Sequence, residues 1–125
     1  MAKKTESGRM ALGRMGEALA ASHLERAGYA IVARNARTRW GELDLVARDG
    51  GAWVFVEVKT RRGGRFGFGA EAVTFAKQRK IIRMAQIFLA QRALWDVAIR
   101  FDVIEVTLEA SAPPALRHLV GAFGA

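Results

Sequence analysis

The chain of 125 residues contains no cysteine. It therefore cannot form disulfides, bind a metal through thiolates or use a cysteine nucleophile. It also lacks any run of about 18 apolar residues that could span a membrane, and its first ten residues lack the apolar centre of a signal peptide. We therefore expect a cytoplasmic protein with no membrane partner.

The chain has fewer acidic than basic residues. Twelve Asp and Glu stand against 20 Lys and Arg, which gives a formal net charge of +8. Neutralising phosphates is the usual reason for such an excess, so we expect a nucleic-acid partner, although solubility, an anionic membrane or an acidic protein would also account for it. The basic residues that we expect to contact nucleic acid are Arg37, Arg39, Arg61, Arg62, Arg65, Lys77 and Lys80.

The length and the 51% hydrophobic content suit one domain with a real core. We expect a flexible N-terminal arm over residues 1–10 and a single domain over residues 11–125. Apolar spacing predicts helices over 12–27 and 74–94, and strands over 29–33, 41–47, 52–59 and 99–106, followed by a short strand or helix over 116–123. The resulting αβββαβ order is typical of an α/β fold with a mixed sheet flanked by helices.

Three ionisable side chains interrupt two neighbouring apolar segments: Asp44, Glu57 and Lys59. The turn Asp49-Gly50-Gly51 between the segments is a strong hairpin signal, so we expect the two strands to pair. Because side chains alternate along a strand, Glu57 and Lys59 share one face. One register of the hairpin brings Asp44 beside Glu57.

Two carboxylates and an ammonium group at this spacing suit phosphodiester chemistry. Carboxylate oxygens are preferred ligands of Mg²⁺, and a fixed lysine charge could stabilise developing negative charge on a phosphate. The alternative is structural, because Lys59 could simply form an ion pair with Glu57 or Asp44 at the end of the sheet.

The string GELDLVARDGGAWVFVEVKTRR resembles the core of the PD-(D/E)xK nuclease superfamily. Together with GRMGEALAASHLERAGYAIVARNARTRW, AEAVTFAKQRK and RFDVIEV, it resembles more closely the YraN family of small bacterial proteins, which is similar to archaeal Holliday-junction resolvases. The resemblance extends from Gly13 to about Phe123.

This resemblance implies a restriction-endonuclease-like fold. It implies that Asp44 and Glu57 are metal ligands for Mg²⁺ or Mn²⁺, that Lys59 is the catalytic lysine, and that Glu17 is an additional acid from the first helix. The implied activity is a structure-selective DNA endonuclease that acts on branched or otherwise structured DNA. A homodimer would supply the two sites that cutting both strands requires. A non-catalytic nucleic-acid-binding module of the same fold is the alternative.

Other polar residues have simpler interpretations. In the first helix, the apolar stripe Leu12, Met15, Leu19, His23 and Ala27 should face the core, with Gly28 as its C-terminal stop. From the residues alone, we expect Glu17 to lie on a solvated face of the helix and His23 to lie in the core or at an interface. We expect Asp102 to form a structural hydrogen bond or ion pair. The glycine-rich segment 63–69 favours a mobile loop, which could also bring Phe66 or Phe68 against a base.

Overall fold

The computed structural model describes residues 8–63 and 73–124. Within them the elements follow one another as α1 (Gly8–Arg26), β1 (Ala30–Thr38), β2 (Gly41–Asp49), β3 (Ala52–Arg62), α2 (Phe75–Gln91), β4 (Ala98–Glu109) and β5 (Ala112–Phe123). The strands form one sheet in the order β1-β2-β3-β4-β5, in which only β3 and β4 pair in parallel. Helix α1 begins at Gly8, so residues 8–10 are helical and do not belong to the predicted arm; residues 1–7 lie outside the described residues.

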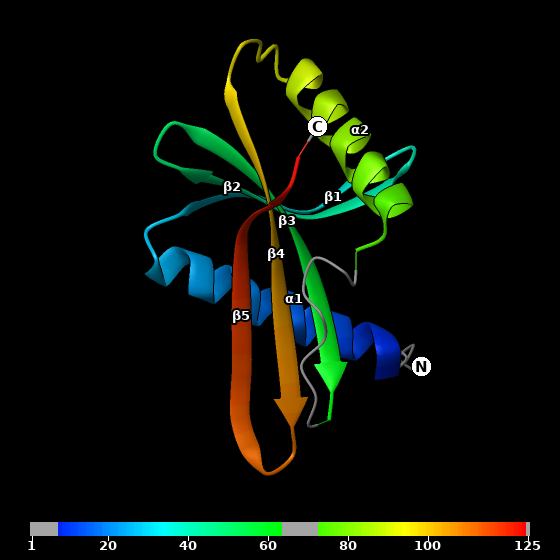
Figure 1. Ribbon diagram of the computed structural model, residues 1–125, viewed down its shortest axis with the longest axis vertical. Coiled ribbons are helices and arrows are strands. Elements are labelled where there is room, and N and C mark those ends of the chain that lie inside the picture. Colours follow the sequence, from blue (N-terminus) through cyan, green and yellow to red (C-terminus); the bar gives the residue numbers. More distant parts are fainter. Residues whose placement is uncertain (1–7, 64–72, 125) are drawn as a thin grey trace, which may run out of the picture.

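The two helices pack against opposite faces of the sheet, and Figure 1 shows α1 and α2 at different levels along it. On the side of α2, Phe88 packs against Phe55, which in turn lies against Phe101. On the side of α1, Leu24 packs with Val56 and the neighbouring strands. This arrangement agrees with the predicted restriction-endonuclease-like fold. Across the part of the chain that the structure describes, neither helix has the length and hydrophobicity needed to cross a membrane.

Local sequence signals place the turns and helix ends as predicted. Asp49 pairs with Ala52 across a two-residue turn in which Gly50 has a φ of +59°, a conformation that glycine adopts without strain. Thr74 caps α2, since its side chain accepts a hydrogen bond from the backbone N–H of Lys77. Gly28, with a φ of +94°, follows the end of α1.

The buried face of α1 differs from the predicted stripe. Met15 of that stripe is 51% exposed, whereas the residues with no exposed surface are Ala20, Ala21 and Leu24. Gly16 is buried against β3, where a Cβ atom at this position would lie 1.8 Å from Thr60 Oγ1. Leu12 and Leu19 of the stripe do pack against the same core as Leu24. The buried face therefore overlaps the stripe but is turned toward the small side chains, which allow α1 to lie close to the sheet.

All five strands extend beyond their predicted ranges, and the reason is clear for β1 and β5. β1 extends beyond residue 33 to Thr38 because its second half pairs with β2. β5 is a strand throughout Ala112–Phe123 and includes Pro113 and Pro114. Prolines are tolerated there because β5 is at the edge of the sheet, where one side of the strand needs no ladder donors.

Candidate active site

The ladder between β2 and β3 stops well before β3 ends. Its last pair is Leu45 with Val56, whereas β3 stays paired with β4 as far as Arg62. Just beyond the last pair, the backbone N–H of Val58 donates to Asp44 Oδ2 at 2.8 Å. The side chain of Asp44 thus replaces a backbone acceptor at the point where the two strands separate.

Strands β1 and β2 are also distorted at this point. Asn35 of β1 has a φ of +50° and lies next to the pair formed by Arg34 and Leu45. On β2, Leu43 packs in the core beneath α2 and Leu45 in the core beneath α1, although residues two apart on a regular strand share a face. Because of this kink, Asp44 lies beyond the regular backbone pairing of β2 with β3.

The hairpin register places Asp44 opposite Glu57, as one of the predicted registers does. The pair that precedes them in the ladder is Leu45 with Val56, and the two carboxyl groups are joined by a hydrogen bond. Burial, the charge of Glu57 and this hydrogen bond raise the pKa of Asp44 to about 8, against the opposing effect of the Val58 N–H. Glu57 itself is only 6% exposed. At neutral pH the pair therefore holds a proton that a cation could replace.

The two lysines at the site have different surroundings. Lys77, near the start of α2, places its Nζ 3.2 Å from Glu57 Oε2. Lys59, two residues after Glu57 on β3, forms no ion pair with any carboxylate within residues 8–63 and 73–124. Among the described residues, the ion pair with Glu57 expected of Lys59 in the structural interpretation is made by Lys77 instead.

Glu17 lies near the carboxylate pair but outside it. Its Oε1 accepts a hydrogen bond of 2.9 Å from Asn35 Nδ2, and its charge contributes to the raised pKa of Asp44 as the weakest of the causes. Glu17 and Asn35 line a small surface hollow of about 180 Å³ together with Arg14 and Arg34. The close contact of Gly16 with Thr60 holds this part of α1 beside the end of β3. Glu17 is therefore neither fully solvated nor a direct partner of the pair.

The acidic pair alone would have to supply the protein ligands of a cation. Among the side chains that the structure describes, no three His, Cys, Asp or Glu residues gather closely enough to hold a metal ion. The half-buried Asp44 and the buried Glu57 offer carboxylate oxygens, and two like charges shielded from water gain from a bound cation. Two carboxylates fit Mg²⁺, which often keeps waters and phosphate oxygens as its other ligands.

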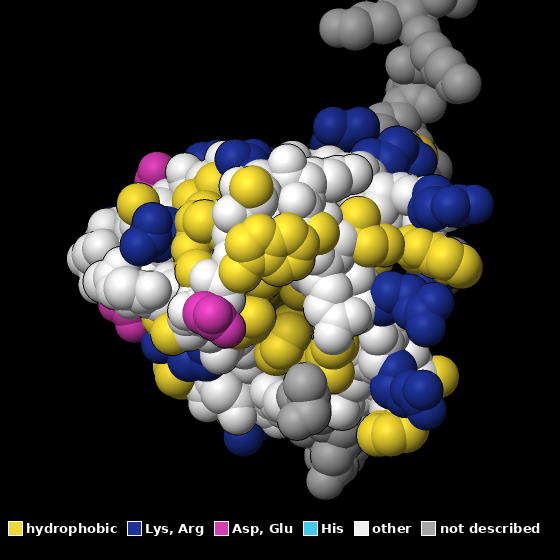
Figure 2. Space-filling model, turned by 90° about the horizontal axis from the view of Figure 1, so that it is seen from above, with side chains coloured by type: hydrophobic (Ala, Val, Ile, Leu, Met, Phe, Trp, Pro, Cys, Tyr) yellow, Lys and Arg dark blue, Asp and Glu magenta, His cyan; other side chains and the backbone are white. Residues whose placement is uncertain are grey.

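The basic residues predicted to contact nucleic acid are distributed over three elements. Arg37 and Arg39 stand at the β1–β2 turn, Arg61 and Arg62 end β3, Lys77 and Lys80 belong to α2, and Arg65 lies outside the described residues. Arg37 is committed in part, because it pairs with Glu42 at 2.8 Å. Figure 2 shows Lys and Arg side chains gathered along one flank, with hydrophobic side chains between them. Their contact with nucleic acid stays a prediction.

Three residues at or near this surface were not identified from the sequence. Trp40 lies beneath two guanidinium groups, with Arg39 at 5.5 Å and Arg83 at 5.4 Å from its ring centroid. Gly16 and Asn35 position Glu17. A pairing of Gly16 with Ala20 on one helix face hints at close packing, but Asn35 and Trp40 carry no signal in the local sequence.

A second buried polar cluster surrounds Asp102, as the structural interpretation of this residue predicts. Asp102 accepts hydrogen bonds from Arg100, from the backbone N–H of Gly121 at 3.0 Å, and shares one of 2.8 Å with His118. Burial opposes its charge, but these partners outweigh burial and lower the pKa of Asp102 to about 2. His23 of α1 lies 3.1 Å from His118 through their ring nitrogens, so this cluster ties α1 to β4 and β5.

Fold and site together define a mixed α/β protein with an acidic pair where two strands part. The sequence profile described as "Uncharacterised protein family UPF0102" matches residues 16–106. A UPF0102 protein of Symbiobacterium thermophilum is 55% identical over 95 residues, covering 76% of this chain and 80% of its own. One of Nocardia farcinica is 52% identical over 116 residues, covering 92% and 91%. The chain belongs to the UPF0102 family, which confirms the family resemblance seen in the sequence.

Proposed function

We propose that this protein is an endonuclease that depends on Mg²⁺ or Mn²⁺ and cuts branched or otherwise structured DNA. The observation that carries the proposal is the pair formed by the half-buried Asp44 and the buried Glu57, with Lys59 two residues further along β3 and in no ion pair among the described residues. A protein that merely binds phosphates has no need for two carboxylates, because like charge beside a nucleic-acid backbone weakens binding unless a cation intervenes.

Asp44 and Glu57 would hold the cation. A divalent ion bound there would neutralise both carboxylates and act as a Lewis acid toward a phosphoryl oxygen. The Val58 N–H fixes the Asp44 side chain at 2.8 Å, and Lys77 holds the Glu57 side chain at 3.2 Å. Both ligands are thus oriented before the cation binds, as a preorganised site requires.

Lys59 would act on the phosphate. It follows Glu57 by two residues on β3, so both side chains leave the same face of the strand. A fixed ammonium group stabilises the negative charge that develops on the phosphate more strongly in the transition state than in the ground state. Lys77 already pairs with Glu57, so within residues 8–63 and 73–124 Lys59 is not needed to balance that charge.

The positive charge of the chain supports DNA as the substrate. Arg61 and Arg62 lie two and three residues after Lys59 on β3, where a phosphate backbone would have to run to reach the carboxylates. Cutting both strands of a branched duplex needs two such sites, whereas one chain offers one acidic pair. We therefore propose that two copies act together on cytoplasmic DNA.

Single-turnover cleavage of a four-way junction, a flap, a linear duplex and a single strand, with and without Mg²⁺ or Mn²⁺, tests the proposal. Lys59→Ala should reduce the rate about 10²–10³-fold on whichever substrate the parent protein cuts, because one oriented electrostatic group is lost. Its DNA affinity and melting temperature should change little. Lys80→Ala is the contrast, since it should weaken binding while leaving the rate at saturating DNA near that of the parent protein.

Calorimetric titration with Mn²⁺ provides a readout that does not depend on cleavage. One site should appear in the parent protein and weaken strongly in Asp44→Asn and Glu57→Gln. Equal Mn²⁺ binding by all three proteins would remove the basis of the proposal. DNA binding without cleavage of any substrate would indicate instead the non-catalytic nucleic-acid-binding module.

A further inference from the structure

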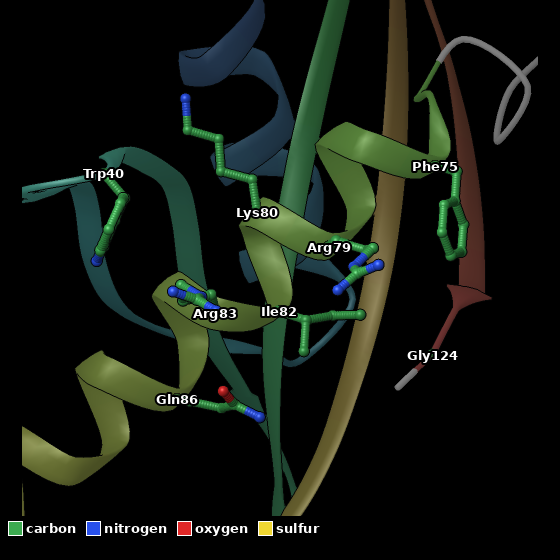
Figure 3. Close-up of a pocket in the computed structure, with 8 residues that line it drawn as sticks. All are labelled: Trp40, Phe75, Arg79, Lys80, Ile82, Arg83, Gln86 and Gly124. Carbon is green, nitrogen blue, oxygen red and sulfur yellow. The ribbon is translucent and has the colours of Figure 1, made fainter.

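A hollow of about 580 Å³ runs along α2 and is also lined by Trp40 of the β1–β2 turn and by Gly124, which follows β5. The cationic side chains that line it are Arg79, Lys80 and Arg83, and its apolar walls include Trp40, Phe75 and Ile82. Figure 3 shows Trp40 on one side and Phe75 on the other, with Arg79 and Arg83 between them. The hollow has the size of a small-ligand site, in which an apolar floor accepts a flat group and the charged rim fixes its orientation.

The aromatic rings of the hollow are open to solvent. The side chain of Phe75 is 71% exposed and that of Trp40 is 42% exposed, although large aromatic residues are usually buried in a core. Guanidinium groups accompany both rings, since Arg79 lies 5.8 Å from the centroid of Phe75 and Arg83 lies 5.4 Å from that of Trp40. Aromatic surface interleaved with cations suits a ligand that is both flat and anionic.

Trp40 is held in place by its neighbours in the turn. Its backbone N–H donates to Thr38 Oγ1 at 3.1 Å, and the same hydroxyl donates to the carbonyl oxygen of Gly41. Gly41 has a φ of +138°, and a Cβ there would stand within 3.6–3.8 Å of the side chains of Met84 and Lys80. The turn therefore packs against α2. This packing holds Trp40 at the hollow before a ligand binds, so that little entropy is lost on binding.

We propose that this hollow binds an unpaired nucleotide of a DNA strand, with the base against Trp40 and its phosphates against Arg79 and Arg83. An acidic peptide would use the cations but not the exposed rings, and intact duplex has no free base face to offer. Stacking of a base on an aromatic ring needs both features of the hollow. The inference rests on the proposed action on structured DNA, and it specifies the substrate as one with unpaired bases close to the cleavage point.

Helix α2 connects the hollow to the acidic pair. Lys77 contacts Glu57, while Lys80 and Arg83 line the hollow on the same helix. At 1.5 Å per residue, the two regions are about 4–9 Å apart along the helix axis. A DNA strand that follows α2 from the carboxylates would therefore bring a nearby nucleotide to the hollow.

Fluorescence anisotropy with labelled DNA in EDTA tests this site without cleavage. The probes are a single-stranded oligonucleotide, a blunt duplex of equal length and a duplex with one forked end. Trp40→Ala should weaken binding of the single strand and the fork about tenfold, as loss of one stacking contact does, and that of the blunt duplex less than twofold. Trp40→Phe should restore most of the affinity. Trp95→Ala is the matched control, because Trp95 is 70% exposed and lies outside the hollow, and it should leave all three affinities unchanged.

The outcomes separate this site from the proposed function. Equal losses for single strand, fork and blunt duplex in Trp40→Ala, or no loss for any of them, would overturn the site even if the parent protein cuts DNA. Binding to anionic phospholipid vesicles that is lost in Trp40→Ala, without binding to the oligonucleotide, would overturn it as well. Selective binding of the single strand and fork through Trp40 by a protein that cleaves nothing would uphold the site and refute the endonuclease.

Discussion

Replacing Asp44 by asparagine should stabilise the metal-free protein at alkaline pH. Asparagine has nearly the same shape as aspartate and keeps an oxygen that can accept the 2.8 Å hydrogen bond from the Val58 N–H. It can also donate to Glu57, so the hydrogen bond between the two side chains survives. What the substitution removes is the negative charge that faces Glu57 in a buried site.

The pH dependence of this effect follows from the raised pKa. Burial and the charge of Glu57 raise the pKa of Asp44 from 3.8 to about 8, so the folded protein holds a proton that the unfolded chain releases. The parent protein therefore loses stability as the pH rises from about 4 to about 8, whereas Asp44→Asn has no such group to ionise. The gain from the substitution should be small at pH 5 and reach its full size above pH 8.

The full difference between 3.8 and about 8 corresponds to about 5–6 kcal/mol if the site stays rigid. Opening of the strand ends toward water lowers this ceiling, so we expect a gain of at least about 2 kcal/mol at pH 8.5. For a chain of this length that is a rise in melting temperature of roughly 6–10 °C.

Circular dichroism melts in EDTA, from pH 5 to pH 9, measure the effect. Glu42→Gln is the matched control, because Glu42 is an exposed acid on the same strand, and its melting curve should follow that of the parent protein at every pH. Adding Mn²⁺ at pH 8.5 should raise the melting temperature of the parent protein and not that of Asp44→Asn. A variant that is less stable than the parent protein at pH 8.5, or equally shifted at pH 5 and pH 8.5, would refute the reasoning.

Two further predictions concern the frame around the site. Gly16→Ala should destabilise the protein by about 1–3 kcal/mol in chemical denaturation, because its Cβ would lie 1.8 Å from Thr60 Oγ1. Gly13→Ala on the same helix meets no atom within 4 Å and should be neutral or slightly stabilising; equal effects would contradict the close packing of α1. Asp102→Asn should cost about 3–5 kcal/mol at pH 7, since Arg100 and His118 lose their buried partner, while Asp96→Asn on the surface should cost little. Because the pKa of Asp102 is lowered to about 2, its carboxylate contributes fully to stability above pH 4, and this contribution is lost as the pH falls toward 2. The stability of Asp102→Asn should therefore approach that of the parent protein in acid.

Much of the fold could be predicted from the sequence because local chemistry specifies it. Asp49-Gly50-Gly51 fixes a two-residue turn, and that turn fixes the register of β2 against β3. The side-chain period of a strand then decides which residues of β3 face α2. The Thr74 cap and the glycine after α1 mark helix ends by the same kind of short-range rule.

The site was predicted in part for the same reason. Asp44 and Glu57 lie opposite each other because they are placed symmetrically about that tight turn, which needs no information from the rest of the chain. The tertiary structure decided what surrounds them. Lys77, which lies 20 residues after Glu57 in the sequence, pairs with it from α2, an ion pair that the local pattern assigned to Lys59.

The contacts that the sequence did not reveal join segments far apart in the chain. The small-residue face of α1 is buried because Gly16 fits against Thr60, and Asn35 adopts a positive φ where β1 kinks beside the carboxylates. Trp40 reaches Arg83 only because the β1–β2 turn rests on α2. Periodicity and turn chemistry reflect interactions between residues that are close in the sequence. Close packing and long-range ion pairs depend instead on which surfaces meet once the chain has folded.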